Sequence, residues 1–211
     1  MILIDAEAFA PGLLRRTPYE WAPLQDALRP EAAAALALSF PTSGFEDVLS
    51  TDSAKPYRMA VRRLRTRDGA LDVAGLPEIW SHLVSELCGD SYRRSLERLA
   101  SVPLAEARVE LSLWRYGSRC FLAPHTDKSE KIVSHVFYLT PDWDASWGGR
   151  LLILRDSSAE SVDQRIAPVM GTSVILRRSA RSWHAVEEVH GETAPSRHSL
   201  QVVFYSPEHA K

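Results

Sequence analysis

The sequence predicts an α+β protein in which helices come first and a double-sheet jelly roll follows. Apolar residues recur at helical spacing before residue 104, and after it they alternate with polar residues as in half-buried strands. About seven or eight short strands at close intervals are typical of an antiparallel sandwich or barrel. We expect residues 1–211 to form a single domain, with 1–103 as a mainly helical buttress with N-terminal strands and 104–208 as the jelly-roll core.

Three segments of the first half have the features of helices. Residues 29–40 place Pro30 near a first turn and continue with an alanine-rich run of high helix propensity. Residues 76–89 put apolar side chains on one face and stop at Gly89, and residues 91–100 form a further short helix.

The strands are expected in the second half, separated by turn residues. A Gly148-Gly149 pair before the apolar run 151–154 predicts a tight hairpin turn into that strand. The expected strand segments are 107–116, 131–140, 151–154, 164–169, 172–177, 184–189 and 197–206.

Composition and charge exclude several classes of partner. The formal net charge is −2 and 45% of residues are apolar, so nothing favours nucleic acid or an anionic membrane. The longest apolar run, 32–40, is too short to cross a bilayer. The opening residues are not those of a secretory signal, and two cysteines are too few for a disulfide framework. We therefore predict a cytoplasmic protein.

A histidine and an aspartate separated by one residue, His125 and Asp127, are the first candidate metal ligands. On a strand, residues i and i+2 face the same side, so both side chains could reach one ion. Chance is the alternative, because a second such pair, His190 and Glu192, also occurs. That second pair spans Gly191 and is expected to lie in a loop.

His184 is the candidate third ligand, at the start of a later strand. Two histidines and one carboxylate leave three coordination positions open, which is the arrangement of non-haem Fe(II) oxygenases. An ordinary histidine at a strand end is the alternative interpretation.

Arg197 and Ser199 open the last expected strand and share one of its faces. A guanidinium directed into an apolar core is costly unless it is paired, but both residues could bind a carboxylate. The alternative is an exposed arginine at the entry to the strand.

Taken in order, the segments "RYGSRCFLAPHTD", "YLTPDW", "WGGRLLIL", "WHAVEEV" and "SRHSLQVVFY" resemble the Fe(II)/2-oxoglutarate-dependent oxygenases, particularly their prolyl-hydroxylase-like branch. The resemblance covers about residues 106–206 and implies a double-stranded β-helix. It also implies roles for individual residues: His125, Asp127 and His184 as iron ligands, Arg197 and Ser199 on the distal carboxylate of 2-oxoglutarate, and Tyr116 and Tyr138 near that co-substrate.

The activity implied by the resemblance is oxidation of a substrate with Fe(II) as cofactor and 2-oxoglutarate and O2 as co-substrates. We expect hydroxylation of an aliphatic carbon in a small molecule, such as a free or carrier-bound amino acid or a secondary-metabolite intermediate, so a carrier protein is a candidate partner. The alternatives are a protein or peptide hydroxylase of the same superfamily, a cupin-like metal enzyme without 2-oxoglutarate, and a β-sandwich binding module. The branch often has lysine where this chain has Arg197, and Val203 stands where nucleic-acid demethylases carry a second arginine.

Candidate substrate residues lie on both sides of the 131–140 segment. Trp143 and Trp147 could form a lid or an apolar wall, or could anchor their own loop. Lys128, with Lys131 and Arg150, could meet an acidic substrate group or be solvated surface charge. A basic cluster within 58–65 could meet a carrier or a carboxylate, although such runs usually form a solvated face.

Overall fold

The computed structural model describes residues 2–10, 12–52, 55–191 and 195–207. Three α-helices lie in the first half of the chain: α1 (Pro30–Leu38), α2 (Glu78–Cys88) and α3 (Asp90–Ala100). Two short 3₁₀ turns, η1 (Ala6–Phe9) and η2 (Ala145–Trp147), complete the helical elements. The strands are β1 (Trp21–Gln25), β2 (Glu46–Ser50), β3 (Tyr57–Arg65), β4 (Arg108–Tyr116), β5 (Phe121–His125), β6 (Lys131–Tyr138), β7 (Leu151–Leu154), β8 (Val162–Ile166), β9 (Thr172–Arg177), β10 (His184–Val186) and β11 (Arg197–Tyr205).

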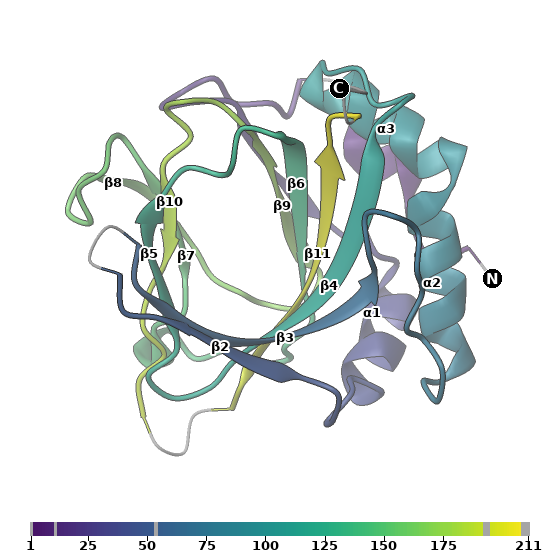
Figure 1. The fold of residues 1–211 in the computed structure, drawn as a ribbon, viewed down its shortest axis with the longest axis horizontal. Helices are drawn as coiled ribbons and strands as arrows, with labels where there is room; N and C mark the ends of the chain where they lie inside the picture. Colours follow the sequence, from purple (N-terminus) through teal and green to yellow (C-terminus); the bar gives the residue numbers. More distant parts are fainter. Residues whose placement is uncertain (1, 11, 53–54, 192–194, 208–211) are drawn as a thin grey trace.

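These strands form one antiparallel sheet that curls around a central space (Figure 1). Its order is β1-β9-β6-β11-β4-β3-β5-β10-β7-β8, and β2 adds to the outer side of β3. One half is built on the long strands β4, β6 and β11, and the other on the shorter strands β5, β7 and β10. The curled sheet matches a double-stranded β-helix, and the predicted jelly-roll fold class is therefore confirmed.

Strand β3 joins the two halves of the sheet. Its residues 60–65 pair with β4, and its first two residues, Tyr57 and Arg58, pair with β5. The expected basic cluster of 58–65 is thus part of a sheet strand within the predominantly helical half. Met59, Val61 and Arg63 share one face of β3, on which Met59 and Val61 are buried and Arg63 is exposed, whereas Arg58 is exposed on the other face. The arginines within this strand interrupt the apolar pattern.

The predicted hairpin turn at Gly148 and Gly149 is wrong. Strand β6 pairs with β9 and β11, whereas β7 pairs with β8 and β10, so the two strands around these glycines are not partners. Both glycines have positive φ, +66° and +65°, and a Cβ on Gly148 would collide with the carbonyl oxygen of Glu188. They are required because this segment passes closely over residues 188–189, not because it reverses into a hairpin.

The helices cover one face of the long-stranded half of the sheet (Figure 1). Their buried residues, including Leu36, Leu83 and Leu96, share one apolar cluster with strand residues such as Leu111 and Phe204. Because the helices hold this outer face, the opposite face of the same strands is left to line the inside of the roll. No helix within the described ranges is long and apolar enough to cross a membrane.

A buried hydrogen-bonded chain links helix α3 to the sheet through His135. The Tyr92 hydroxyl lies 2.9 Å from His135 Nδ1, and His135 Nε2 lies 2.9 Å from the Ser173 hydroxyl. Phe9 packs edge-on against both rings. His135 is fully buried, so it serves as a packing and hydrogen-bonding residue of the core.

This buried histidine predicts a loss of stability in acid. Burial lowers the pKa of His135 from 6.5 to about 3, so below pH 6.5 the unfolded chain binds a proton that the folded chain does not. The contribution to the free energy of unfolding is complete above pH 6.5 and falls as the pH approaches 3, by about 1.4 kcal/mol per pH unit. Urea unfolding of the metal-free protein should therefore show a shallower pH dependence, by that amount, in His135→Gln.

Tyr92→Phe is the matched control, because it removes the hydrogen bond and keeps the titrating ring. It should lower the free energy of unfolding by about 1 kcal/mol at every pH without changing the slope. An unchanged slope in His135→Gln would contradict the assignment of this acid sensitivity to His135.

Candidate metal centre and co-substrate pocket

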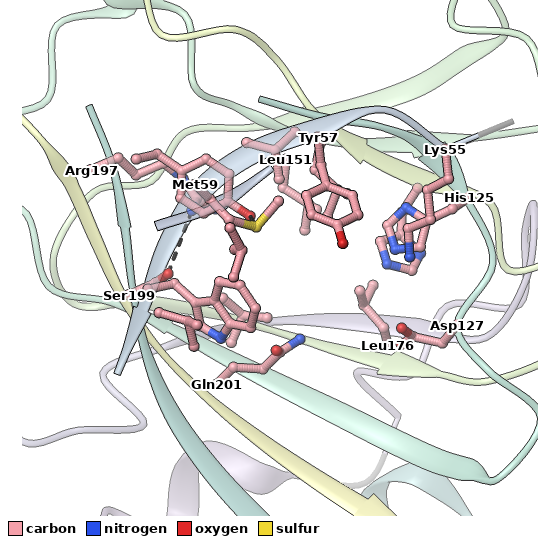
Figure 2. Close-up of a pocket in the computed structure, with 18 of the residues that line it drawn as sticks. Lys55, Tyr57, Met59, His125, Asp127, Leu151, Leu176, Arg197, Ser199 and Gln201 are labelled. Carbon is pink, nitrogen blue, oxygen red and sulfur yellow. Dashed lines mark hydrogen bonds between the residues drawn. The ribbon is translucent and has the colours of Figure 1, made fainter. Parts of the chain in front are cut away.

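The inside of the curled sheet contains a cavity of about 360 Å³. Figure 2 shows Arg197 and Ser199 at one end and His125 and Asp127 at the other. Apolar side chains from both halves of the sheet, such as Met59 and Leu176, line the walls between these ends. A cavity of this size with few polar groups at defined places is typical of a small-molecule site.

Three potential metal ligands meet at one end of this cavity. His125 is the last residue of β5, Asp127 follows two residues later, and His184 is the first residue of β10. Strands β5 and β10 are antiparallel partners, and their register sets His184 directly opposite His125, with ring centroids 4.3 Å apart. One ligand atom from each of the three buried residues lies within 4.8 Å of the other two.

Backbone contacts orient both imidazole rings toward the same point. Nδ1 of His125 lies 3.0 Å from the Ala123 carbonyl oxygen, and Nδ1 of His184 lies 2.9 Å from the Ser182 carbonyl oxygen. Since a carbonyl only accepts, each Nδ1 must carry the proton, which leaves the lone pair of each Nε2 available for a metal. The two rings therefore fit the role of metal ligands.

The Asp127 carboxylate is also held by donors. Oδ1 accepts from Lys131 Nζ at 2.6 Å, and Oδ2 accepts from the Ser134 hydroxyl at 3.1 Å. Asp127 follows the end of β5 and does not lie on a strand with His125, so these donors, rather than strand geometry, orient it. Each oxygen retains a further lone pair, so the carboxylate can still bind a cation.

The protonation states of the three groups suit a cation. Burial, reinforced by the neighbouring His184, lowers the pKa of His125 to about 2, and burial also lowers the pKa of His184. Burial alone would raise the pKa of Asp127, but Lys131 and the two histidines outweigh it and bring the pKa below its usual value. At neutral pH the site therefore offers two neutral imidazoles and one carboxylate, as Fe(II) requires.

At the other end of the cavity, Arg197 and Ser199 share one face of β11, as predicted from their spacing. Both are 2% exposed, and Arg197 Nη1 lies 3.4 Å from the Ser199 hydroxyl oxygen. Within the described residues Arg197 forms no ion pair, and its Nε has no hydrogen-bond partner. A buried guanidinium without a counter-ion is costly, so this end of the cavity fits an anionic group.

Two tyrosines pack around the Arg197 guanidinium. Its Cζ lies 4.8 Å from the ring centroid of Tyr116 and 5.0 Å from that of Tyr138. Burial raises the pKa of Tyr116 to about 12, so the phenol stays neutral and donates to Met59 Sδ at 3.2 Å. Tyr116 lines the cavity, whereas Tyr138 is buried beside it with an unpaired hydroxyl.

Of the other candidate substrate residues, some line the cavity and others do not. Lys128 lines the cavity, but Trp143 and Trp147 are not among its lining residues. Trp143 instead donates to the Gly148 carbonyl at 2.9 Å and packs against Trp147, as a loop-anchoring residue does. Arg150 pairs with Glu187 outside the cavity.

The remaining histidines of the sequence lie away from the triad or outside the description. His82 is an exposed partner of Glu78 on α2. His190 is exposed as expected for a loop, and its predicted partner Glu192, like His209, lies outside the described residues.

The sequence reasoning missed the cavity face of β3 and the residue that leads into it. Lys55, Tyr57 and Met59 line the cavity, and Val61 and Arg63 continue the same face. The period-two spacing of Tyr57, Met59, Val61 and Arg63 was a visible signal, but the arginines between them obscured it.

A model of the 2OG-Fe(II) oxygenase superfamily matches residues 111–205, a range that contains all three potential metal ligands, Arg197 and Ser199. This region of the chain belongs to that superfamily. The matched region is accordingly that of a non-haem iron oxygenase, an enzyme class that uses Fe(II), 2-oxoglutarate and O2, and the resemblance read from the sequence motifs is confirmed for this region.

Solved structures agree on the fold. A Pseudomonas putida prolyl-4-hydroxylase is 19% identical with a TM-score of 0.66, and the match covers 89% of this chain and 92% of that one. A 2OG-Fe(II) oxygenase family oxidoreductase from Burkholderia pseudomallei is 18% identical with a TM-score of 0.64, covering 88% and 84%. A Trichoplax adhaerens prolyl hydroxylase in complex with a peptide fragment is 16% identical with a TM-score of 0.61, covering 88% and 83%.

The site predicts stoichiometric binding of one divalent metal ion. Calorimetric titration of the protein with Co(II), a redox-stable substitute for Fe(II), should give one site, and His184→Ala should weaken it by at least ~100-fold, more than loss of an outer hydrogen bond does. The exposed His82→Ala is the control and should bind as the unsubstituted protein does. Full affinity in His184→Ala would contradict the three-residue site.

Proposed function

We propose that this oxygenase hydroxylates an aliphatic carbon of a small molecule, with His125, Asp127 and His184 holding Fe(II) and Arg197 binding 2-oxoglutarate. The observation that supports this assignment most strongly is the buried, unpaired Arg197 in the same cavity as the three ligands. A metal site alone would suit a cupin-like enzyme, but that alternative offers no reason to bury an unpaired guanidinium opposite the metal.

The metal ligands act by holding one side of the ion and leaving the other side open. Hydrogen bonds from each Nδ1 to a backbone carbonyl prevent the two imidazoles from rotating, and Lys131 and Ser134 limit the motion of the carboxylate. When bound, iron would activate O2, which is the oxidant: one oxygen atom would oxidise 2-oxoglutarate to succinate and CO2, and the other would enter the substrate. The side chains of the cavity position the iron and the co-substrate and surround them with apolar walls.

Arg197 binds the far carboxylate of 2-oxoglutarate in this proposal. Its planar fork matches a carboxylate with two parallel hydrogen bonds, and the Ser199 hydroxyl can donate a third. The flanking rings of Tyr116 and Tyr138 restrict the guanidinium to one orientation. The co-substrate is thereby oriented before it reaches the metal, which lowers the entropic cost of the reaction.

The apolar walls of the cavity keep the reacting centre dry. Leu151 from β7, Leu176 from β9 and Val186 from β10 surround the space between the two polar ends. Exclusion of water strengthens the electrostatic contacts inside and protects a reactive centre from side reactions.

The size of the cavity favours a small molecule over a folded protein as the substrate. About 360 Å³ lies at the lower end of the range for small-molecule pockets, and 2-oxoglutarate takes part of it. A peptide substrate is the second candidate, because one structure of the same fold is a prolyl hydroxylase in complex with a peptide fragment.

The proposal predicts an optical signature of 2-oxoglutarate chelation. Anaerobic addition of Fe(II) and then 2-oxoglutarate should produce a weak visible charge-transfer band that saturates at one equivalent of each. Arg197→Ala should raise the apparent dissociation constant for 2-oxoglutarate about 10- to 100-fold, since a hydrogen bond to a charged group is worth about 1.5–3 kcal/mol.

Arg155→Ala is the matched control, because Arg155 is an exposed arginine paired with Asp163 and does not line the cavity. Its affinity for 2-oxoglutarate should be unchanged. Metal binding without the band would favour a cupin-like enzyme, and a normal affinity in Arg197→Ala would remove Arg197 from the co-substrate site while leaving the metal site intact.

A further inference from the structure

The lysines of this chain are concentrated around the cavity. The sequence contains 25 basic residues, of which only four are lysines, and three of these four line the cavity: Lys55, Lys128 and Lys131. The fourth, Lys211, lies outside the described residues. Because arginine serves elsewhere as the usual basic residue, the gathering of lysines at one place points to a local requirement for ammonium groups.

The three lysines come from two segments at the metal end of the cavity. Lys55 lies just before β3, and the next residue, Pro56, accepts a hydrogen bond from the Ala123 amide of β5 at 3.0 Å. Lys128 follows Asp127 directly, and its carbonyl accepts from the Lys131 amide at 3.1 Å, which closes a turn. Figure 2 shows Lys55 beside His125, at the end opposite Arg197 and Ser199.

The charges at this end do not balance. Among the residues that the structure describes, Asp127 is the only acidic one that lines the cavity, and Lys131 already binds it at 2.6 Å. Over the described ranges neither the half-buried Lys55 nor the exposed Lys128 forms an ion pair, so two ammonium groups at this end have no counter-ion. Fe(II) is a dication and 2-oxoglutarate a dianion, so binding of both together leaves the positive excess in place.

Like charges within range of one another raise the cost of this arrangement. Burial lowers the pKa of Lys55, Asp127 raises it, and the neighbouring Lys131 and Lys128 lower it. A bound anion would relieve the repulsion and compensate for the burial of the ammonium.

We propose that the substrate of this oxygenase carries an anionic group, a carboxylate or a phosphate, which Lys55 and Lys128 bind beside the metal centre. The inference rests on the proposed function and names the class of substrate for the same site. The two ammonium groups orient the substrate by its charged end and leave its aliphatic part against Tyr57, Leu122 and Val136, which line the cavity.

Lysine suits this role better than arginine. An ammonium is a compact charge on a flexible stem, so it can follow a ligand that enters and leaves. A guanidinium next to Asp127 could form a bidentate pair with it and compete with the metal for that carboxylate.

The test uses simple anions as probes, so it does not require the natural substrate. The protein is loaded with Mn(II), a paramagnetic substitute for Fe(II), and saturated with 2-oxoglutarate. Inorganic phosphate is then followed by the width of its ³¹P resonance, and acetate and the neutral acetamide by the widths of their methyl ¹H resonances. Saturable broadening reports binding close to the metal.

We expect saturable broadening of phosphate or acetate and none of acetamide. Lys55→Met/Lys128→Met should weaken binding of the anion at least ten-fold, each single variant should weaken it less, and added salt should weaken it in the unsubstituted protein. Arg155→Met, which removes an exposed charge that does not line the cavity, should leave the broadening unchanged. Tighter binding of phosphate would identify a phosphorylated substrate, and tighter binding of acetate a carboxylic acid.

Two results would overturn the inference while the proposed function stands. One is equal broadening of anions and acetamide, or of the unsubstituted and double-variant proteins, in a chain that still forms the Fe(II)–2-oxoglutarate band. The other is a double variant whose affinity for 2-oxoglutarate falls together with its affinity for the probes, because the lysines would then belong to the co-substrate site. Absence of the band from the unsubstituted protein would instead overturn the proposed function, and this inference with it.

Discussion

The pairing of β10 with β5 is the constraint on which the site depends. It brings His184 opposite His125 across 59 residues of sequence, and the same two strands join the short-stranded half of the sheet to β3. A slip of β10 by one residue in this register would turn His184 to the other face and away from His125. Closure of the roll and assembly of the candidate metal ligands therefore depend on the same strand pairing.

Two charged side chains of the cavity, Asp127 and Arg197, are buried. Lys131 and Ser134 of β6 donate hydrogen bonds to Asp127, whereas Arg197 at the far end of the cavity contacts a hydroxyl and two aromatic rings and has no counter-ion among the described residues. The cavity thus contains both paired and unpaired charges within apolar walls. Such an arrangement is a poor way to stabilise a fold, but it suits a site whose charges are completed by ligands.

The helices cover the outer face of the long-stranded half of the sheet, and this burial allows its inner face to carry polar side chains. Leu83, Leu96 and their neighbours cover the outer face of β4, β6 and β11, and the buried Tyr92–His135–Ser173 chain ties α3 to two of the sheet's strands. The outer face supplies the apolar core, so residues such as Ser199 and Gln201 on the inner face are free to serve ligands.

The sequence by itself determined the helices, the strands of the second half other than β5, and the residue types of the site, because periodicity and i, i+2 spacing are local properties of the chain. Only the tertiary structure decided that Gly148 and Gly149 serve a close backbone approach rather than a hairpin, and that β3 is a strand of the cavity wall. It also decided that Lys55 lies beside His125, since a contact between residues 70 positions apart depends on strand pairing and sheet curvature, which no local pattern records.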